Sequence, residues 1–284
     1  MGQDWQIDGP RVLDIGGEGE AVRRLKIGLV AGRVDIVTHE DSPTARLEVH
    51  SVSGKPLLVT WDGSSLKVSH VKDKDGNLWE SLKRFSKEHE RPNARLSLSV
   101  PSGTDVAVST VSAEALVTGV RAGVKANTVS GSLTLADIVG DVDANTVSGD
   151  IECHQLEGDF KGNSVSGPLT VQASRLEQIK LNSVSGDITL DLLKGTARIN
   201  SNSVSGDVTV RIPAGGGFAV NAHTASGAVV IDGTSMTGPS GKRGGQLVEG
   251  NQALVVKANS VSGNVVVLRA QPIQDTVPPQ QSAG

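Results

Sequence analysis

The sequence has few aromatic residues and almost no cysteine. Aromatic residues make up 2% of its 284 residues, and tyrosine is absent. Compact cores normally rely on the bulk of aromatic rings, so a core built from Val, Ile and Leu favours thin β layers over a thick globule. The single Cys153 excludes an intrachain disulfide framework and a metal site with several cysteine ligands.

The chain also has no excess of basic residues. Its formal net charge is -4, whereas nucleic-acid-binding proteins usually carry a basic face, so we expect no nucleic-acid partner. Residues 1–6 lack the basic and apolar segments of a signal peptide, and no apolar run approaches transmembrane length. We therefore expect a cytoplasmic protein without a membrane span of its own.

One pentad, Asn-Ser/Thr-Val-Ser-Gly, recurs through the second half of the chain. Its glycines are separated by steps of 18, 18, 19 and 20 residues, then 21 to a degenerate copy at Gly227 and 36 to the last copy. Steps near 20 residues are typical of stacked coils. The first and last residues of the six full copies are Asn127 and Gly131, Asn145 and Gly149, Asn163 and Gly167, Asn182 and Gly186, Asn202 and Gly206, and Asn259 and Gly263.

Alternating apolar pairs flank each pentad, such as Val142/Ala144 before it and Ile151/Cys153 after it. The two pairs have opposite sequence parity, so both can face one core only if the chain turns a corner near the asparagine. We expect glycine to supply backbone freedom at this corner, valine to fill the core, and Ser or Thr to satisfy backbone groups. Asparagines in successive coils should form a ladder of amide hydrogen bonds.

These patterns predict an all-β fold: a β-solenoid, similar to a parallel β-helix, of about eight coils with 18–20 residues each. We expect residues 1–105 to form a β-rich capping segment and residues 106–270 to form the solenoid repeats. A short helix is expected at 78–88, where Leu78, Leu82 and Phe85 share one stripe. The Gly-rich stretch 233–250 is expected to be an insertion loop or hairpin that projects from the stack, and residues 271–284 a disordered tail.

No pattern of residues indicates catalysis, a cofactor or a metal. The segment Gly238–Lys242 fails the phosphate-loop pattern, because Met236 stands where glycine is required and Arg243 where Ser or Thr is required. Asp150, Asp187 and Asp207 follow glycines directly, unlike the calcium-binding β-roll repeat, and are expected to be solvated turn residues. Cys153 occupies an apolar position of its coil and should be buried.

The first interpretation of function is therefore a non-catalytic interaction or scaffolding module. Its flat faces or terminal coils would bind a protein partner or a second copy, because a stack of β coils ends in an unpaired edge. The alternative is a carbohydrate-active or carbohydrate-binding β-helix, which the near absence of stacking aromatics disfavours. A third interpretation is a sensor that docks on a membrane protein.

The repeat and the segment before it resemble the DUF4097 family, also known by the names adhesin and toastrack. The resemblance includes Val30-Ala-Gly-Arg-Val-Asp-Ile36, the step Val100-Pro-Ser-Gly103 and the serial Ser-Gly-Asp coils, and it covers about residues 25–270. The layout is similar to actinobacterial members. It implies a β-solenoid without catalytic residues and a link to adhesion or envelope-stress signalling.

Overall fold

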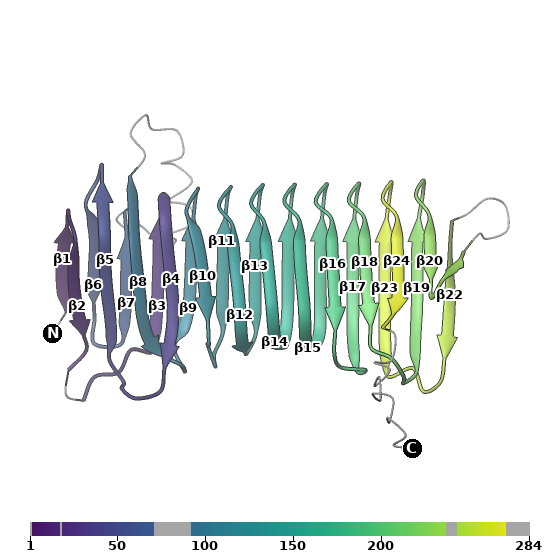
Figure 1. Ribbon diagram of the computed structural model, residues 1–284, viewed down its shortest axis with the longest axis horizontal. Coiled ribbons are helices and arrows are strands. Elements are labelled where there is room, and N and C mark those ends of the chain that lie inside the picture. Colours follow the sequence, from purple (N-terminus) through teal and green to yellow (C-terminus); the bar gives the residue numbers. More distant parts are fainter. Residues whose placement is uncertain (1, 18, 71–91, 237–242, 271–284) are drawn as a thin grey trace, which may run out of the picture.

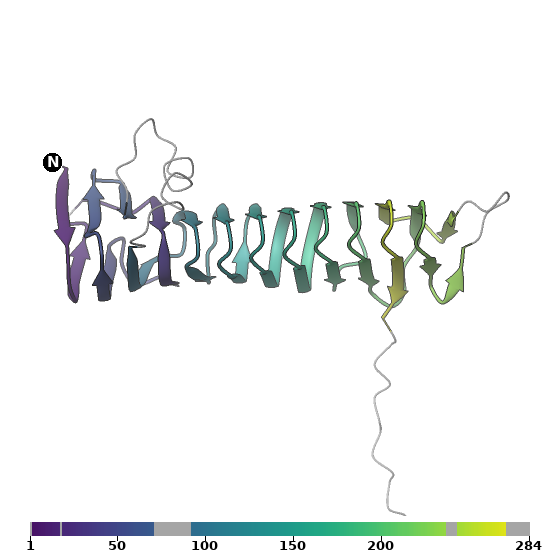
Figure 2. The same ribbon diagram turned by 90° about the horizontal axis from the view of Figure 1, so that it is seen from above.

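The computed structural model describes residues 2–17, 19–70, 92–236 and 243–270. Its 24 strands lie in two layers that run side by side along a long, flattened stack (Figure 1), which Figure 2 shows from above. The described residues contain no helix, and so none that is long and apolar enough to cross a membrane. The helix expected at 78–88 and the tail expected at 271–284 lie outside the described residues.

Hydrogen-bonded strands follow one another along each layer from the N-terminal end of the stack to its C-terminal end. Layer A contains, in this order, β1 (Gln3–Ile7), β6 (Leu57–Trp61), β7 (Ser65–Ser69), β3 (Arg24–Leu29), β9 (Asp105–Thr110), β11 (Val124–Thr128), β13 (Val142–Thr146), the ends of β14 (Ile151–Ser164) and β15 (Leu169–Ser183), β17 (Ala197–Ser203), β23 (Leu254–Ser260), β19 (Phe218–Thr224) and β22 (Arg243–Glu249). Layer B contains β2 (Arg11–Ile15), β5 (Ala45–Ser53), β8 (Asn93–Pro101), β4 (Ala31–His39), β10 (Glu114–Thr118), β12 (Leu133–Val139), the starts of β14 and β15, β16 (Ile188–Leu192), β18 (Val208–Ile212), β24 (Val265–Arg269), β20 (Val229–Ile231) and β21 (Thr234–Ser235).

The repeating unit is a coil made of one strand in layer A, a corner, and one strand in layer B. Neighbouring coils pair in parallel and in register, so that Asn127 lies opposite Asn145 and Leu133 lies opposite Ile151. Both layers are continuous across residue 105, because β9 pairs with β3 on one side and with β11 on the other.

The core lies between the two layers and consists mainly of aliphatic side chains. The predicted apolar pairs are confirmed as buried, among them Val142, Ala144 and Ile151. Cys153 is fully buried between Leu135 and Val171 of the adjacent coils, as its position in the repeat predicts. Val, Ile and Leu fill most of this thin core, and Trp61, Phe160 and Phe218 are also buried in it.

The corner between the layers differs from the prediction in which side chain it buries. The pentad valine, expected in the core, is exposed: 38% for Val147, 44% for Val165 and 51% for Val261. The buried residue is the Ser or Thr before it. Thr128 donates a hydrogen bond from Oγ1 to the carbonyl of Gly131 and accepts one from its N–H, both 3.0 Å long. The hydroxyl therefore closes the corner, as the sequence predicted for this residue type.

The pentad glycines are required by close packing and not by the backbone freedom expected from the sequence. None of those in the six full copies has a φ in the left-handed region. A Cβ on Gly149 would lie 2.0 Å from the carbonyl oxygen of Gly131, and one on Gly167 would lie 1.9 Å from that of Gly149. Each coil thus rests directly on the backbone of the coil before it, and a side chain would separate them.

The last coil in the sequence is not the last coil in space. Strand β23 pairs in parallel with β17 on one side and with β19 on the other, and β24 lies likewise between β18 and β20. After β18 the chain skips one coil position and forms β19 and β20 in the position beyond it. It then returns, and β23 and β24 fill the skipped position. Arg269 on β24 fixes this arrangement through ion pairs to Asp232 at 2.9 Å and to Glu249 at 2.6 Å.

Antiparallel strands cover both ends of the stack. At the C-terminal end, β22 pairs antiparallel with β19, so the expectation of a projecting loop or hairpin at 233–250 is wrong for residues 243–249. At the N-terminal end, β6 pairs antiparallel with β7 and with β1, while β5 pairs antiparallel with β8 and with β2. The parallel coils therefore do not form the outer edge at either end.

Substituting Gly167→Ala should lower the free energy of unfolding by about 3 kcal/mol, because the added methyl group overlaps the carbonyl oxygen of Gly149. The measurement is a urea titration followed by circular dichroism. The control is Gly103→Ala, where an added Cβ meets nothing within 4 Å. Equal stability of the two variants would contradict the role of close coil packing.

Candidate functional site

The outer face of layer A carries three files of mainly polar side chains, each formed by the residues that occupy one position in successive coils. The residues point outward because they alternate along each strand with the buried ones. The aspartate file consists of Asp105, Asp141 and Asp159, with Gly123 and Gln178 at equivalent positions. The lysine file consists of Lys26, Lys125, Lys161, Lys180 and Lys257. The asparagine ladder consists of Asn127, Asn145, Asn163, Asn182, Asn202 and Asn259.

The asparagine ladder is continuous, which confirms the prediction from the pentad. Each Nδ2 donates a hydrogen bond to Oδ1 of the preceding asparagine, with a length of 3.1 Å from Asn145 to Asn127 and 2.7 Å from Asn163 to Asn145. The bonds continue through Asn182 and Asn202 to Asn259. An amide has two N–H donors. The second donor of Asn145 bonds Oδ1 of Asp143, and that of Asn202 bonds Oδ1 of Asn200. Asn163 and Asn182 keep a second donor beyond the ladder bond.

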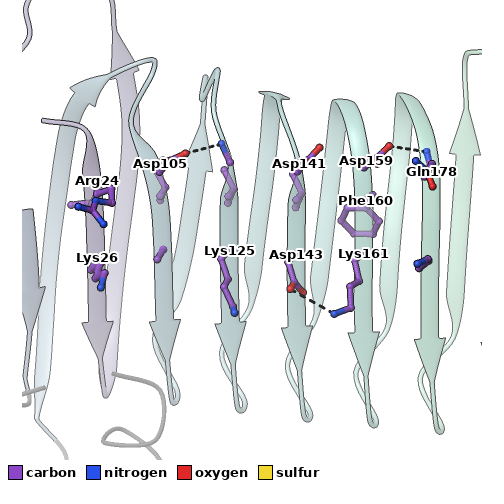
Figure 3. A pocket seen from close by; sticks show the side chains of 17 residues that line it. Arg24, Lys26, Asp105, Lys125, Asp141, Asp143, Asp159, Phe160, Lys161 and Gln178 are labelled. Atoms are coloured by element: carbon purple, nitrogen blue, oxygen red, sulfur yellow. Dashed lines mark hydrogen bonds and ion pairs between the residues drawn. The ribbon is translucent and has the colours of Figure 1, made fainter. Parts of the chain in front are cut away.

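A groove of about 500 Å³ runs between the aspartate and lysine files across β3, β9, β11, β13, β14 and β15 (Figure 3). Its lining includes two small residues that face outward, Ala107 and Gly123. Arg24 and Lys26 border it at one end, and Gln178 and Lys180 border it at the other. The groove is therefore long and open, and charged side chains line it.

The aspartates hold neighbouring coils together as well as lining the groove. Oδ1 of Asp105 accepts a hydrogen bond from the backbone N–H of Gly123 at 3.2 Å, and that of Asp159 accepts one from Gln178 at 3.0 Å. These bonds satisfy the first N–H of the next strand. The aspartate file thus has a structural role in addition to its charge.

The lysines have few such partners. Among the ion pairs of the described residues, the lysine file contributes one, from Lys161 Nζ to Asp143 at 3.8 Å. Elsewhere on the surface, cations pair with carboxylates of adjacent segments at shorter distances, including Lys194 with Glu177 at 2.7 Å and Arg121 with Asp137 at 3.0 Å. The lysine file is therefore the less neutralised cationic row.

Among the described residues, Cys153 and His70 are buried titratable groups, and neither lines the groove. Burial raises the pKa of the Cys153 thiol well above its usual range, which keeps it protonated and unreactive. Burial lowers the pKa of His70 to about 4, and its Nδ1 accepts a hydrogen bond from the N–H of Val30. Within the described ranges, no three His, Cys, Asp or Glu side chains are close enough to hold a metal ion.

A second linear feature is the valine ridge, formed by the exposed pentad valines along the narrow edge of the stack. It consists of Val147, Val165, Val184, Val204 and Val261. Each ridge residue follows a buried Ser or Thr and precedes an exposed Ser. The ridge consists of valines and contains no charged residue.

Sequence reasoning identified the asparagines and glycines of the repeat but missed the lysine and aspartate files. The structure brings the asparagines together on the surface, whereas the glycines are buried at the corners and contact no groove. A signal for the lysines was present, because a lysine stands two residues before the asparagine in four of the six full pentads, at Lys125, Lys161, Lys180 and Lys257.

Comparison with known proteins identifies a family. The family model described as Toastrack DUF4097 matches residues 37–268. No curated protein matches the sequence.

Solved structures with a related arrangement include a candidate lipid-binding protein from Parabacteroides distasonis, with 14% identity, coverage of 93% of this chain and 99% of that chain, and a TM-score of 0.49. Another is a candidate adhesin from Bacteroides fragilis, with 9% identity, coverage of 94% and 96%, and a TM-score of 0.37. Similarity at this level is no guide to a ligand.

Substituting Asn163→Ala should lower the free energy of unfolding, measured by urea titration, by about 1–2 kcal/mol, because it removes one ladder bond on each side.

Substituting Val165→Ser should change the free energy of unfolding by about 0.5 kcal/mol or less, since this valine is exposed. The matched control Val171→Ser should cost about 3 kcal/mol, because Val171 is fully buried. Urea unfolding measures all three. A larger loss for Val165→Ser than for Val171→Ser would contradict the described corner.

Proposed function

Because this chain belongs to the Toastrack DUF4097 family, we propose that it is a non-catalytic β-solenoid interaction module that binds an extended partner along the outer face of layer A. The in-register parallel coils support the solenoid description. The family assignment gives the class of protein, and the proposal of a binding role rests on the surface of layer A.

The observation that carries the proposal is the repetition of like side chains at strand spacing beside a groove. The asparagine ladder repeats at about 4.8 Å per coil, and the lysine file places its lysines at intervals of one or two coils. Such a surface offers the same contact many times in a straight line. A partner that is itself extended and repetitive can use all these contacts at once, which multiplies weak single contacts into useful affinity.

The closed ends of the stack favour binding through a side face over end-to-end assembly. A second copy could extend the stack only by pairing with an edge strand, and short edge strands that carry charged residues disfavour such pairing. The edge strands are β1 and β2 at one end and β21 and β22 at the other, which have two to seven residues and include Asp4, Arg11 and Arg243. We therefore propose that the protein acts as a single rod and not as a filament.

Three finer expectations stay predictions. They are the cytoplasmic location, the similarity to actinobacterial members and the link to adhesion or envelope-stress signalling. A membrane-protein partner is likewise untested. None of them is needed for the proposal that the outer face of layer A is the binding surface.

The mass of the purified protein, measured by light scattering over a concentration series, should stay that of a single chain. The reason is that the strands at both ends do not continue the parallel repeat. Growth of the mass with concentration, together with rods in negative-stain images, would contradict the proposal and show end-to-end assembly.

A matched variant tests the cause of this behaviour. Replacing residues 234–249 by a short Gly-Ser linker removes β21 and β22 and leaves the edge of β19 open. This variant should associate at concentrations where the wild type does not, provided that circular dichroism shows an unchanged β content. A folded variant that stays monomeric would show that β22 is not what closes this end.

A further inference from the structure

The lysine file forms a straight row of cations on a chain whose formal net charge is negative. It holds five lysines and one acid, Asp143, over β3, β9, β11, β13, β14, β15, β17 and β23, while the whole chain has a net charge of -4. Lys125, Lys161, Lys180 and Lys257 are exposed, and Lys26 is half-buried. Lys161 and Lys180 lie directly opposite each other on adjacent strands, and like charges in this position destabilise a sheet.

The spacing of the lysines sets the spacing of charges on the ligand. Lys26, Lys125 and Lys161 follow one another at steps of two coils, whereas Lys161 and Lys180 lie opposite each other on adjacent strands. Two coils correspond to about 10 Å at the usual strand spacing. The matching ligand is an extended polymer with an anionic group at about this interval. In an extended chain of pyranose sugars, this is close to the length of a disaccharide.

The aspartate file limits how wide the ligand can be. Asp141 directly precedes β13 and lies two residues before Asp143. Asp159 and Lys161 are two residues apart on β14, which is about 7 Å along a strand. A broad polyanionic surface, such as duplex nucleic acid or an anionic membrane, would bring negative charge over Asp105, Asp141 and Asp159. A narrow single chain can lie on the lysine side of the groove and avoid them.

The asparagine ladder supplies the neutral contacts. It runs two residues beyond the lysine file on the same strands, as with Lys161 and Asn163 on β14. Asn163 and Asn182 each retain an amide N–H beyond the ladder bond, and hydroxyl groups are the partners that amides bind readily in sugars. The chain has no tyrosine, and the exposed residues of the groove include no aromatic ring, so recognition would depend on charge and amides instead of stacking.

We infer that the lysine file and the asparagine ladder bind a linear anionic polysaccharide that carries one carboxylate per disaccharide. This inference rests on the proposed function and names the ligand class of the same face. The carboxylates lie against Lys26, Lys125 and Lys161, and the sugar hydroxyls face the ladder. The polymer is bound and not cut.

The test measures binding of a fluorescent polymer of alternating glucuronate and N-acetylhexosamine to the full-length protein, at low and at physiological salt. The wild type should bind it, should bind more weakly at higher salt, and should not bind the same polymer with its carboxyl groups reduced. The triple variant Lys26→Gln, Lys125→Gln and Lys161→Gln should bind at least about tenfold more weakly. A Lys→Arg triple variant at the same positions should retain binding.

The matched control removes three cations outside the file, through Arg121→Gln, Arg175→Gln and Arg211→Gln. These arginines pair with Asp137, Glu157 and Asp191, and the control variant loses the same total charge. Binding by the control should equal that of the wild type. An equal loss in both triple variants would overturn the inference, because total charge alone would then explain the binding.

Further outcomes separate the ligand from the general function. No binding of the polymer by a monomeric wild type would overturn the ligand inference and leave the closed-end rod intact. Tighter binding of duplex DNA or of phosphatidylserine vesicles would also overturn it in favour of those partners. Shortening of the polymer during incubation would instead overturn the non-catalytic function.

Discussion

Main-chain hydrogen bonding between neighbouring coils, at a separation of about 4.8 Å, is the constraint on which the rest of the structure depends. At the corners this separation leaves no room for a Cβ, and so glycine stands at Gly131, Gly149 and Gly167. On the outer face it brings successive asparagine amides within hydrogen-bonding distance. In the core it allows each coil only a thin layer of aliphatic side chains, which accounts for the low aromatic content.

The same constraint turns a sequence repeat into a surface. A residue type that recurs two positions before the pentad asparagine becomes a straight row of that side chain on layer A, as Lys161 and Lys180 illustrate. In the aspartate file, Asp105 and Asp159 accept hydrogen bonds from backbone N–H groups of the next coil. The side chains of the lysine file make fewer such contacts and can therefore bind a partner. The groove lies between one row of each kind.

Much of this architecture could be predicted from the sequence because the repeat is local and periodic. The period gave the coils, and alternation gave the buried residues such as Ile151 and Cys153. The exposed Val165 was misplaced, because parity shows that a corner exists but not at which residue the chain turns. The left-handed Asp137, Gln155 and Ala173 share no residue type, so composition gives no signal for them.

Spatial order was the other feature beyond the reach of the sequence. The step of 36 residues before Gly263 was interpreted as a loop, but β23 and β24 lie between coils that precede them in the chain. Long-range pairing of this kind leaves no local pattern, because Asn259 would fit opposite any asparagine of the ladder. The ion pairs of Arg269 with Asp232 and Glu249 help to fix the actual position.

The most direct test of this account is the unfolding free energy of two deletion variants, measured by urea titration. Removing residues 150–167 deletes 18 residues, which is one step of the repeat, and it joins coils that remain in register. This variant should unfold cooperatively and keep a stability close to that of the full chain. Removing residues 150–163 shifts the register and should abolish cooperative unfolding. Similar behaviour of the two variants would contradict the claim that register between coils holds the structure together.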